Sequence, residues 1–275
     1  HKQLPAVVQL PENQTMVEVK ELHQIGLFNL RNSLFERLHW LEKNHDRSNF
    51  VGLLNHQGRM HSDIAQFVNA KFYDGKLCVV PLPHQIEKLD WQHTDNIYEQ
   101  FVAQTRIGFV RIAQLKNTDN LCVNIPEASA ITKIIEAICT LHSKNALENF
   151  EPAKQIGIIV PFRSQISAIR NSLRKQGLAC ADTITIDTVE CYQGSQRDYI
   201  LYSTTISEPY QVHIISNLQE IDGNIVDRKL NVALTRARKQ LFIFGNPEIL
   251  RHSPLYSDLM SYCRHLDMMS TSLIE

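Results

Sequence analysis

The chain has 275 residues, 43% of them apolar, which is enough to bury the core of one large domain or of two modest ones. Its formal net charge of -1 excludes a globally basic surface, so any binding of nucleic acid has to use a local groove. No apolar run approaches the length of a membrane span and no signal peptide is visible, so no membrane partner is expected.

The first part of the chain predicts two helices and a mixed segment. Ser33-Leu34-Phe35-Glu36 has the form of a capping box, and leucines at helical spacing follow it, which predicts a helix over about 33–43. A second helix is predicted to begin near Ser62, with Ile64, Phe67 and Val68 on one face. Residues 81–120 combine prolines and polar residues with a stretch over 107–112 that is typical of a strand, and we expect this segment to be peripheral.

Regular alternation of strands and helices begins at about Pro126. Strands are predicted over 155–160, 183–188, 199–206 and 240–244, and helices around 131–138, 164–176 and 230–237. This order predicts an α/β fold with a mostly parallel sheet covered on both faces, followed by a helical tail that packs on the outside. Because ligands of such sheets bind at the carboxyl ends of the strands, we expect the chemistry in 161–165, in 188–198 and from 207 onward.

The most informative segment is residues 228–238, RKLNVALTRAR. Four basic residues flank an apolar stripe of Leu230, Ala233, Leu234 and Ala237, and Arg236 falls outside this stripe, so it is expected to project away from the core. A guanidinium binds phosphate oxygens through two parallel donors and stays charged. A solvated basic helix face is the commoner meaning of such a pattern, and composition alone favours it.

Residues 186–198 form a second segment that is a candidate for ligand binding. A predicted strand ends, a polar turn follows, and Gly194 in this turn permits close approach of the backbone to a ligand. The alternative is an ordinary connection between two strands.

Both segments resemble motifs of superfamily 1B helicases. NVALTRAR at 231–238 resembles motif VI, which implies that Arg236 is an arginine finger reaching ATP from the second RecA-like domain. TVECYQGSQRD at 188–198 resembles motif V, which reads T-V-x-x-x-Q-G-x-E-x-D, and the resemblance implies nucleotide contacts by Gln193, Gly194 and Gln196. Gln196 replaces the family's acidic residue near the nucleotide sugar; its amide can bond a hydroxyl but brings no charge.

Three further segments resemble motifs of this family more weakly, and they follow one another along the chain in the same order as in the family. Residues 54–61, LNHQGRMH, resemble Q-Y-R-M-H, which implies that Arg59 is a second cation near the γ-phosphate, although Gly58 stands where the family has an aromatic residue. The opening HKQLPAVV resembles the end of motif III, with Gln3 as the γ-phosphate sensor.

The third match is VPFRSQ at 160–165, which resembles motif IV, with Phe162 where tyrosine is usual. The resemblance implies that this loop and motif V face single-stranded nucleic acid or the nucleotide, and Thr188, Phe162 and Gln165 are the expected nucleic-acid contacts. For Phe162, a plain core position is an equal alternative. Asn124 and Glu127 match a lesser element that we interpret as structural.

The resemblance implies a RecA-like P-loop NTPase fold, the second domain of a helicase. We expect residues 1–49 to be the tail of the first RecA-like domain with a bridging helix, residues 50–250 to be the second domain, and residues 251–275 to be a helical tail. ATP and Mg²⁺ are expected in the cleft between the two domains, held mainly by an N-terminal half that carries the phosphate-binding loop. No G-x-x-x-x-G-K-[ST] occurs in this chain, so we expect a fragment of a longer protein that is inactive alone and that, in the full enzyme, travels 5′ to 3′ along single-stranded DNA or RNA.

Two other classes of protein remain as alternatives. A degenerate, non-catalytic helicase half that binds nucleic acid or a protein is favoured by Gly58 and Gln196 and opposed by the retention of Arg59 and Arg236. A dinucleotide-binding enzyme would need a G-x-G-x-x-G that the chain lacks.

The cysteines and histidines predict no metal centre. The six cysteines have no metal-knuckle spacing, which indicates reduced thiols in a cytoplasmic protein, and a site at His56 and His61 lacks a third ligand.

Overall fold

The computed structural model describes residues 15–30, 32–45, 47, 50–52, 54–113, 121–145, 149–221 and 224–268. The chain divides into two compact units, His1–Asn55 and His56–Glu275, which we describe separately. Among the described residues, no helix combines the length and the apolar character that crossing a membrane requires.

The described part of the first unit contains α1 (Lys20–His23) and α2 (Leu34–Asn44). Helix α2 begins at the expected capping box. The Ser33 hydroxyl accepts a bond from the Glu36 amide at 3.2 Å, and the Glu36 carboxylate accepts one from the Ser33 amide at 2.7 Å. The predicted helix over 33–43 is therefore confirmed.

The second unit is built on a six-stranded parallel sheet with the order β10-β3-β9-β6-β4-β5. Its four inner strands are mainly apolar and buried on both faces, as expected for a parallel sheet between two helical layers, whereas the edge strands β5 and β10 are polar and more accessible. Their bounds are β3 Ile107–Arg111, β4 Ile156–Val160, β5 Thr185–Thr188, β6 Arg197–Ser203, β9 Ala237–Gly245 and β10 Arg264–Asp267.

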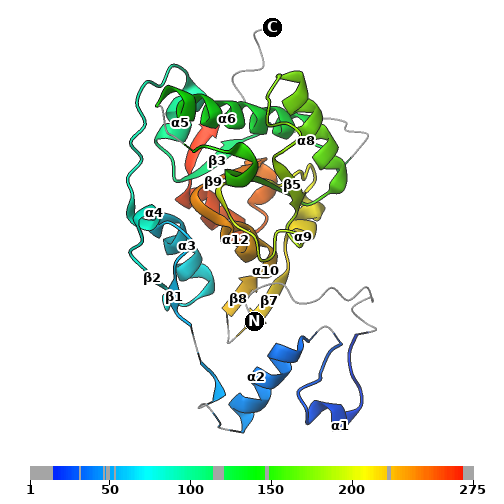
Figure 1. Ribbon diagram of the computed structural model, residues 1–275. Coiled ribbons are helices and arrows are strands. Elements are labelled where there is room, and N and C mark those ends of the chain that lie inside the picture. Colours follow the sequence, from blue (N-terminus) through cyan, green and yellow to red (C-terminus); the bar gives the residue numbers. More distant parts are fainter. Residues whose placement is uncertain are drawn as a thin grey trace. The chain divides into compact units, whose positions relative to one another are not determined.

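Helices cover both faces of this sheet (Figure 1). One face packs against α5 (Ile97–Ala103), α6 (Ile125–Lys144) and α8 (Arg163–Lys175), and the main apolar core lies there. The other packs against α3 (Ser62–Phe72), α10 (Arg228–Leu234) and α12 (Pro254–Tyr262). On that side the hydroxyls of Tyr202 and Tyr256 lie 2.9 Å apart. The expected α/β architecture, a parallel sheet with helices on both faces, is confirmed.

Short elements complete the unit. They are β1 (His56–Gln57) and β2 (Cys78–Val79), which pair in parallel, α4 (Pro83–Ile86), α7 (Pro152–Gln155), the 3₁₀ helix η3 (Pro209–Gln211), α9 (Val212–Ile215), the antiparallel hairpin of β7 (Leu218–Ile221) and β8 (Asn224–Asp227), and α11 (Pro247–Leu250).

Three sequence predictions need correction. The segment 81–120 is not wholly peripheral, because β3 lies between β9 and β10 with Phe109 and Val110 fully buried. The C-terminal segment is not only helical, because β10 joins the sheet beside β3. The helix predicted around 230–237 ends at Leu234, and Ala237 is already the first residue of β9.

Candidate functional site

Arg59 is presented by a tightly bonded loop. The Gln57 side-chain oxygen accepts bonds from the amides of Arg59 at 3.0 Å and Met60 at 2.8 Å. The Gln85 side chain, which is fully buried, donates to the carbonyls of Gln57 at 3.0 Å and Met60 at 2.9 Å. The backbone that carries Arg59 is therefore fixed from two sides by side-chain amides.

The half-buried guanidinium of Arg59 joins segments that are far apart in the sequence. Its Nε donates to Oε1 of Gln196 at 3.0 Å, and one of its terminal nitrogens donates to the carbonyl of Thr235 at 3.1 Å. Burial lowers the pKa of Arg59 from its usual value. The structure thus brings Arg59, Gln196 and the 235–236 turn into one site.

Arg236 lies in the same site, but its side chain is only 1% exposed. Its Nε donates to the carbonyl of Val232 at 3.0 Å, and its terminal nitrogens donate to the carbonyl of Ser195 at 3.3 Å and to the hydroxyl of Thr235 at 3.2 Å. The expectation that Arg236 projects away from the core is therefore wrong. Helix α10 has already ended, and the guanidinium folds back onto the Val232 carbonyl in its last turn, where carbonyls lack amide partners within the helix.

The site carries two cations without an anion. Among the described residues, neither Arg59 nor Arg236 forms an ion pair with a carboxylate. Burial, and next the nearby Arg59, lower the pKa of Arg236 to about 10. An anionic ligand bound here stabilises the charged guanidinium groups, because it compensates for their lost solvation and for the repulsion between them.

The site lies at the amino edge of the sheet. Gln196 directly precedes β6 and Arg236 directly precedes β9, and the first residues of these parallel strands, Arg197 and Ala237, are paired. Our expectation that the chemistry follows the strands at their carboxyl ends is wrong for these residues. The reason is that the 188–198 connection starts at the carboxyl end of β5 and returns to the amino end of β6.

The predicted nucleotide-binding residues of this connection are exposed. Gln193, Gly194 and Gln196 all face solvent, and Gly194 has φ +89°, a conformation that residues with a Cβ rarely adopt. Tyr192 is buried beneath them and donates to the carbonyl of Thr185 at 2.7 Å, which ties the turn to β5.

The residues predicted to contact nucleic acid belong to the opposite, carboxyl edge. Thr188 ends β5 and Phe162 caps α8, and both are partly buried. Gln165 differs, because it is fully buried and its amide accepts from the Asn124 amide at 2.8 Å and donates to the Asn124 carbonyl at 2.9 Å. This side chain has no exposed surface with which to touch a nucleic acid, and we assign it to holding the loop before α6.

Glu127, which we interpreted as structural from the sequence, is the centre of a buried network. Its carboxylate accepts from the Ser203 hydroxyl at 2.5 Å and from the Thr205 amide at 2.9 Å. Burial raises the pKa of Glu127 to about 7, against the opposing effect of these bonds. Thr205 has φ +58°, a strained conformation for a β-branched residue, so Glu127 holds a strained loop at the carboxyl end of β6.

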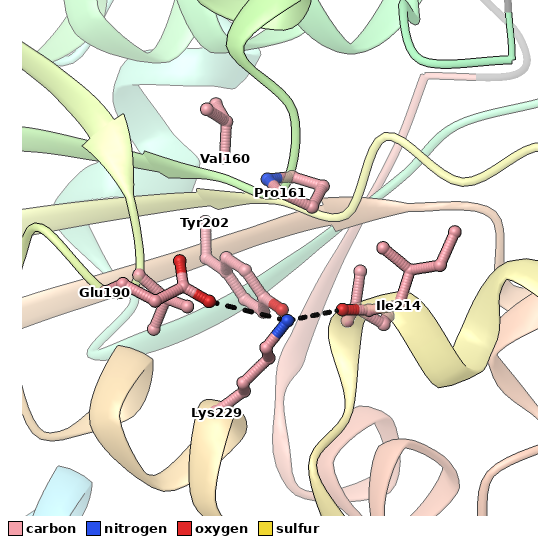
Figure 2. A pocket seen from close by; sticks show the side chains of 8 residues that line it. Val160, Pro161, Glu190, Tyr202, Ile214 and Lys229 are labelled. Carbon is pink, nitrogen blue, oxygen red and sulfur yellow. Dashed lines mark hydrogen bonds and ion pairs between the residues drawn. The ribbon is translucent and has the colours of Figure 1, made fainter. Parts of the chain in front are cut away.

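A small pocket opens beside this edge, and residues of all three segments in which we expected chemistry, 161–165, 188–198 and 207 onward, contribute to its lining (Figure 2). Lys229 reaches into it from α10, and its ammonium donates to the carbonyl of Ile214 at 2.8 Å and lies 3.5 Å from a carboxylate oxygen of Glu190. The lining residues are Val160, Pro161, Val189, Glu190, Tyr202, Ile214, Ile215 and Lys229.

Two further predictions from the sequence concern Gln3 and the absence of a metal centre. Gln3, the predicted γ-phosphate sensor, lies outside the described residues. In the part of the chain that the structure describes, no three histidine, cysteine or acidic side chains gather as metal ligands, and none of the six cysteines forms a disulfide.

Comparisons with known proteins give a consistent picture. The family model of an AAA domain matches residues 30–248. Helicase sen1 of Schizosaccharomyces pombe is 33% identical over 248 residues, which are 90% of this chain and 13% of that protein. Regulator of nonsense transcripts 1 of Dictyostelium discoideum is 31% identical over 247 residues, which are 87% of this chain and 16% of that protein. The chain thus spans less than a fifth of either relative.

Among solved structures, the C-terminal domain of a possible DNA helicase from Lactobacillus plantarum matches with a TM-score of 0.40 and 11% identity, over 76% of this chain and 98% of that one.

Proposed function

The chain belongs to the AAA domain family, in the form found in the C-terminal part of superfamily 1 helicases, and from this premise we propose that it is the C-terminal motor domain of an ATP-dependent helicase or translocase. The observation that carries the proposal is the pair of guanidinium groups, Arg59 and Arg236, in one site without a carboxylate partner among the described residues. Such a pair suits the charge of a triphosphate.

The residues of the site fit ATP bound with Mg²⁺, which we expect to be held mainly by an N-terminal RecA-like half. ATP supplies the phosphoryl group and its negative charge. Arg59 is the first contact, because it is half-buried and its loop is already fixed by Gln57 and Gln85. Gln196 orients the Arg59 guanidinium through its 3.0 Å bond, and it does so without neutralising the charge that the phosphate needs.

Arg236 acts as the arginine finger only after its contacts change. In the described conformation its nitrogens bond Val232, Ser195 and Thr235, so it has to exchange at least part of these bonds for phosphate oxygens. All three acceptors are uncharged oxygens, and a phosphate is a stronger partner for a guanidinium. Arg236 is therefore expected to reach the phosphates only when ATP binds, and not to be exposed in the absence of ATP.

Single-stranded nucleic acid is proposed to bind at the carboxyl edge, with Thr188 and Phe162 as contacts. The nucleotide and nucleic-acid sites then lie at opposite edges of one sheet, joined by the 188–198 connection. A hydroxyl bonds phosphate oxygens and an aromatic ring supports a base. Closure of the two RecA-like halves on ATP and reopening after hydrolysis then moves the strand, because the two conformations differ in affinity for ATP.

A degenerate, non-catalytic module is the second candidate, favoured by two features of the site. Gly58 stands in open space, since a Cβ added there meets only the Leu82 side chain at 3.4 Å, so the chain offers no aromatic ring at this position. Gln196 brings no carboxylate. The bond between Arg59 and Gln196 argues against this second candidate, because it gives Gln196 a defined contact in the site and so favours a glutamine that functions at this position.

The deciding experiment is ATP hydrolysis by the longer protein that contains this chain, with and without single-stranded nucleic acid. Hydrolysis that is stimulated by the nucleic acid and lost on Arg236→Ala supports the motor. Binding of nucleic acid without any hydrolysis by the unmodified protein supports the module instead.

A further inference from the structure

Lys229 and Glu190 form a loose ion pair at the pocket of Figure 2. The Lys229 ammonium donates to the Ile214 carbonyl at 2.8 Å, whereas its distance to the Glu190 carboxylate is 3.5 Å. Strong ammonium–carboxylate bonds are about 2.7–2.9 Å long, so this pair is not tightly bonded. The side chains are 26% and 39% exposed, which leaves both accessible from outside.

The Lys229 ammonium has donor capacity to spare. It carries three N–H groups, of which the Ile214 carbonyl takes one. Within the described part of the chain, that carbonyl and Glu190 are the ammonium's only polar partners. An acceptor from outside the chain can therefore bond Lys229 without breaking the bond to Ile214.

The pocket adjoins both residues that we assign to nucleic-acid binding. Its walls include Pro161, which precedes Phe162, and Val189, which follows Thr188. Figure 2 shows the Lys229 amine between the Glu190 carboxylate and the Ile214 carbonyl, in front of the Tyr202 ring. A phosphate chain that contacts Thr188 and Phe162 thus passes next to a cation that neither motif contains.

Resting on the proposed function, we propose that Lys229 binds a backbone phosphate of single-stranded nucleic acid and that Glu190 occupies the Lys229 ammonium until the phosphate displaces it. Carboxylate and phosphodiester are both anions, so they compete for one ammonium group. Glu190 then lowers the affinity for nucleic acid and limits how tightly the strand is held. A translocating protein needs such a limit, because it has to release each phosphate to move on.

This competition predicts effects of opposite sign for the two partners. Lys229→Met removes one phosphate contact, which lowers the salt dependence of single-strand binding by about 0.7 in log–log slope and lowers affinity about five-fold at moderate salt. Glu190→Gln frees the ammonium and raises affinity, and the double variant binds like Lys229→Met. A pair that only ties the 188–198 connection to α10 gives weaker binding in both single variants, together with lower thermal stability.

The test uses the complete chain and fluorescent oligo(dT) and oligo(rU), titrated by anisotropy over a series of salt concentrations, with a thermal melt of each variant. The matched control is Lys239→Met. The Lys239–Glu87 pair has a similar distance, 3.2 Å, and similar exposure, 31% and 36%, but Lys239 lies near the amino end of β9. Lys239→Met is expected to change affinity much less than Lys229→Met.

Each outcome decides for or against the proposal. Opposite shifts for Lys229→Met and Glu190→Gln support it with either oligonucleotide, and the oligonucleotide that shows them identifies the nucleic acid. Equal losses for Lys229→Met and Lys239→Met, or no gain for Glu190→Gln, overturn it. If the Lys229→Met variant does not fold, the affinity of the Glu190→Gln variant, whose substituted side chain is exposed, decides the question. Intact binding that depends on Phe162 but not on Lys229 rejects the role of the pocket alone, whereas no binding by the unmodified chain rejects the nucleic-acid site at the carboxyl edge as well.

Discussion

The Nε of Arg59 donates to the side-chain oxygen of Gln196 at 3.0 Å, although the two residues are 137 positions apart. The bond brings the loop before α3 to the turn before β6, and it leaves the positive charge of Arg59 uncompensated because its acceptor is a neutral amide. The candidate nucleotide site is therefore an assembly of three chain segments, with Arg236 supplied by the third.

Replacing Arg236 with alanine in the longer protein is expected to lower ATP turnover by about 10³-fold or more, as loss of an arginine finger does. Steady-state hydrolysis at saturating nucleic acid measures the effect. Arg236→Lys is also expected to fall well below the unmodified protein, since an ammonium lacks the planar fork. The control is Arg251→Ala, whose exposed guanidinium pairs with Glu248 on α11. Near-normal turnover by Arg236→Ala removes the assigned role.

The 275-residue chain alone is expected to hydrolyse no ATP, because its sequence contains no phosphate-binding loop. The measurement is phosphate release by the purified chain, followed across fractions of its final column. Activity that co-elutes with the chain and is lost on Arg59→Ala contradicts the two-domain scheme.

Replacing Gln165 with alanine is expected to destabilise the fold by about 1–3 kcal/mol, because the amide and the carbonyl of Asn124 lose their buried partner. Nucleic-acid affinity of the folded chain should change little. Phe162→Ala is expected to behave in the opposite way, with weaker binding of single strands. Chemical denaturation and anisotropy, run on both variants, separate the two roles. A binding loss by Gln165→Ala as large as that of Phe162→Ala would overturn this assignment.

Glu127 is expected to make the stability of the fold depend on pH. Its pKa is raised in the folded state to about 7, above the ordinary value of 4.5, so the folded state binds the proton more tightly. The resulting stabilisation is complete below pH about 4.5 and is lost as the pH rises through about 7. Its size is on the order of 3 kcal/mol. Denaturation midpoints between these pH values measure it, and Glu127→Gln should flatten the dependence. An equal slope in both proteins shows that another group titrates.

Local sequence patterns predicted most of the long helices and central strands of this protein and their order. The capping box at Ser33 and the apolar runs that became β4, β6 and β9 are local patterns, and the structure confirms the helix and the strands that they predict. The motif that contains Arg236 likewise needed no partner to be recognised, because its residues are contiguous. The family membership was therefore readable from the chain alone.

The position of each site residue was decided by the tertiary structure. Which edge of the sheet a residue occupies depends on the direction and pairing of strands, and these join segments far apart in the sequence. The burial of Arg236 follows from the end of α10 one turn earlier than its apolar stripe suggests, and the burial of Gln165 follows from the loop that it holds.

The Lys229 pocket exists only because α9, α10 and the ends of β4 and β6 meet there. Periodicity reports which side of its own element a residue faces, and only the packed fold determines what lies on that side.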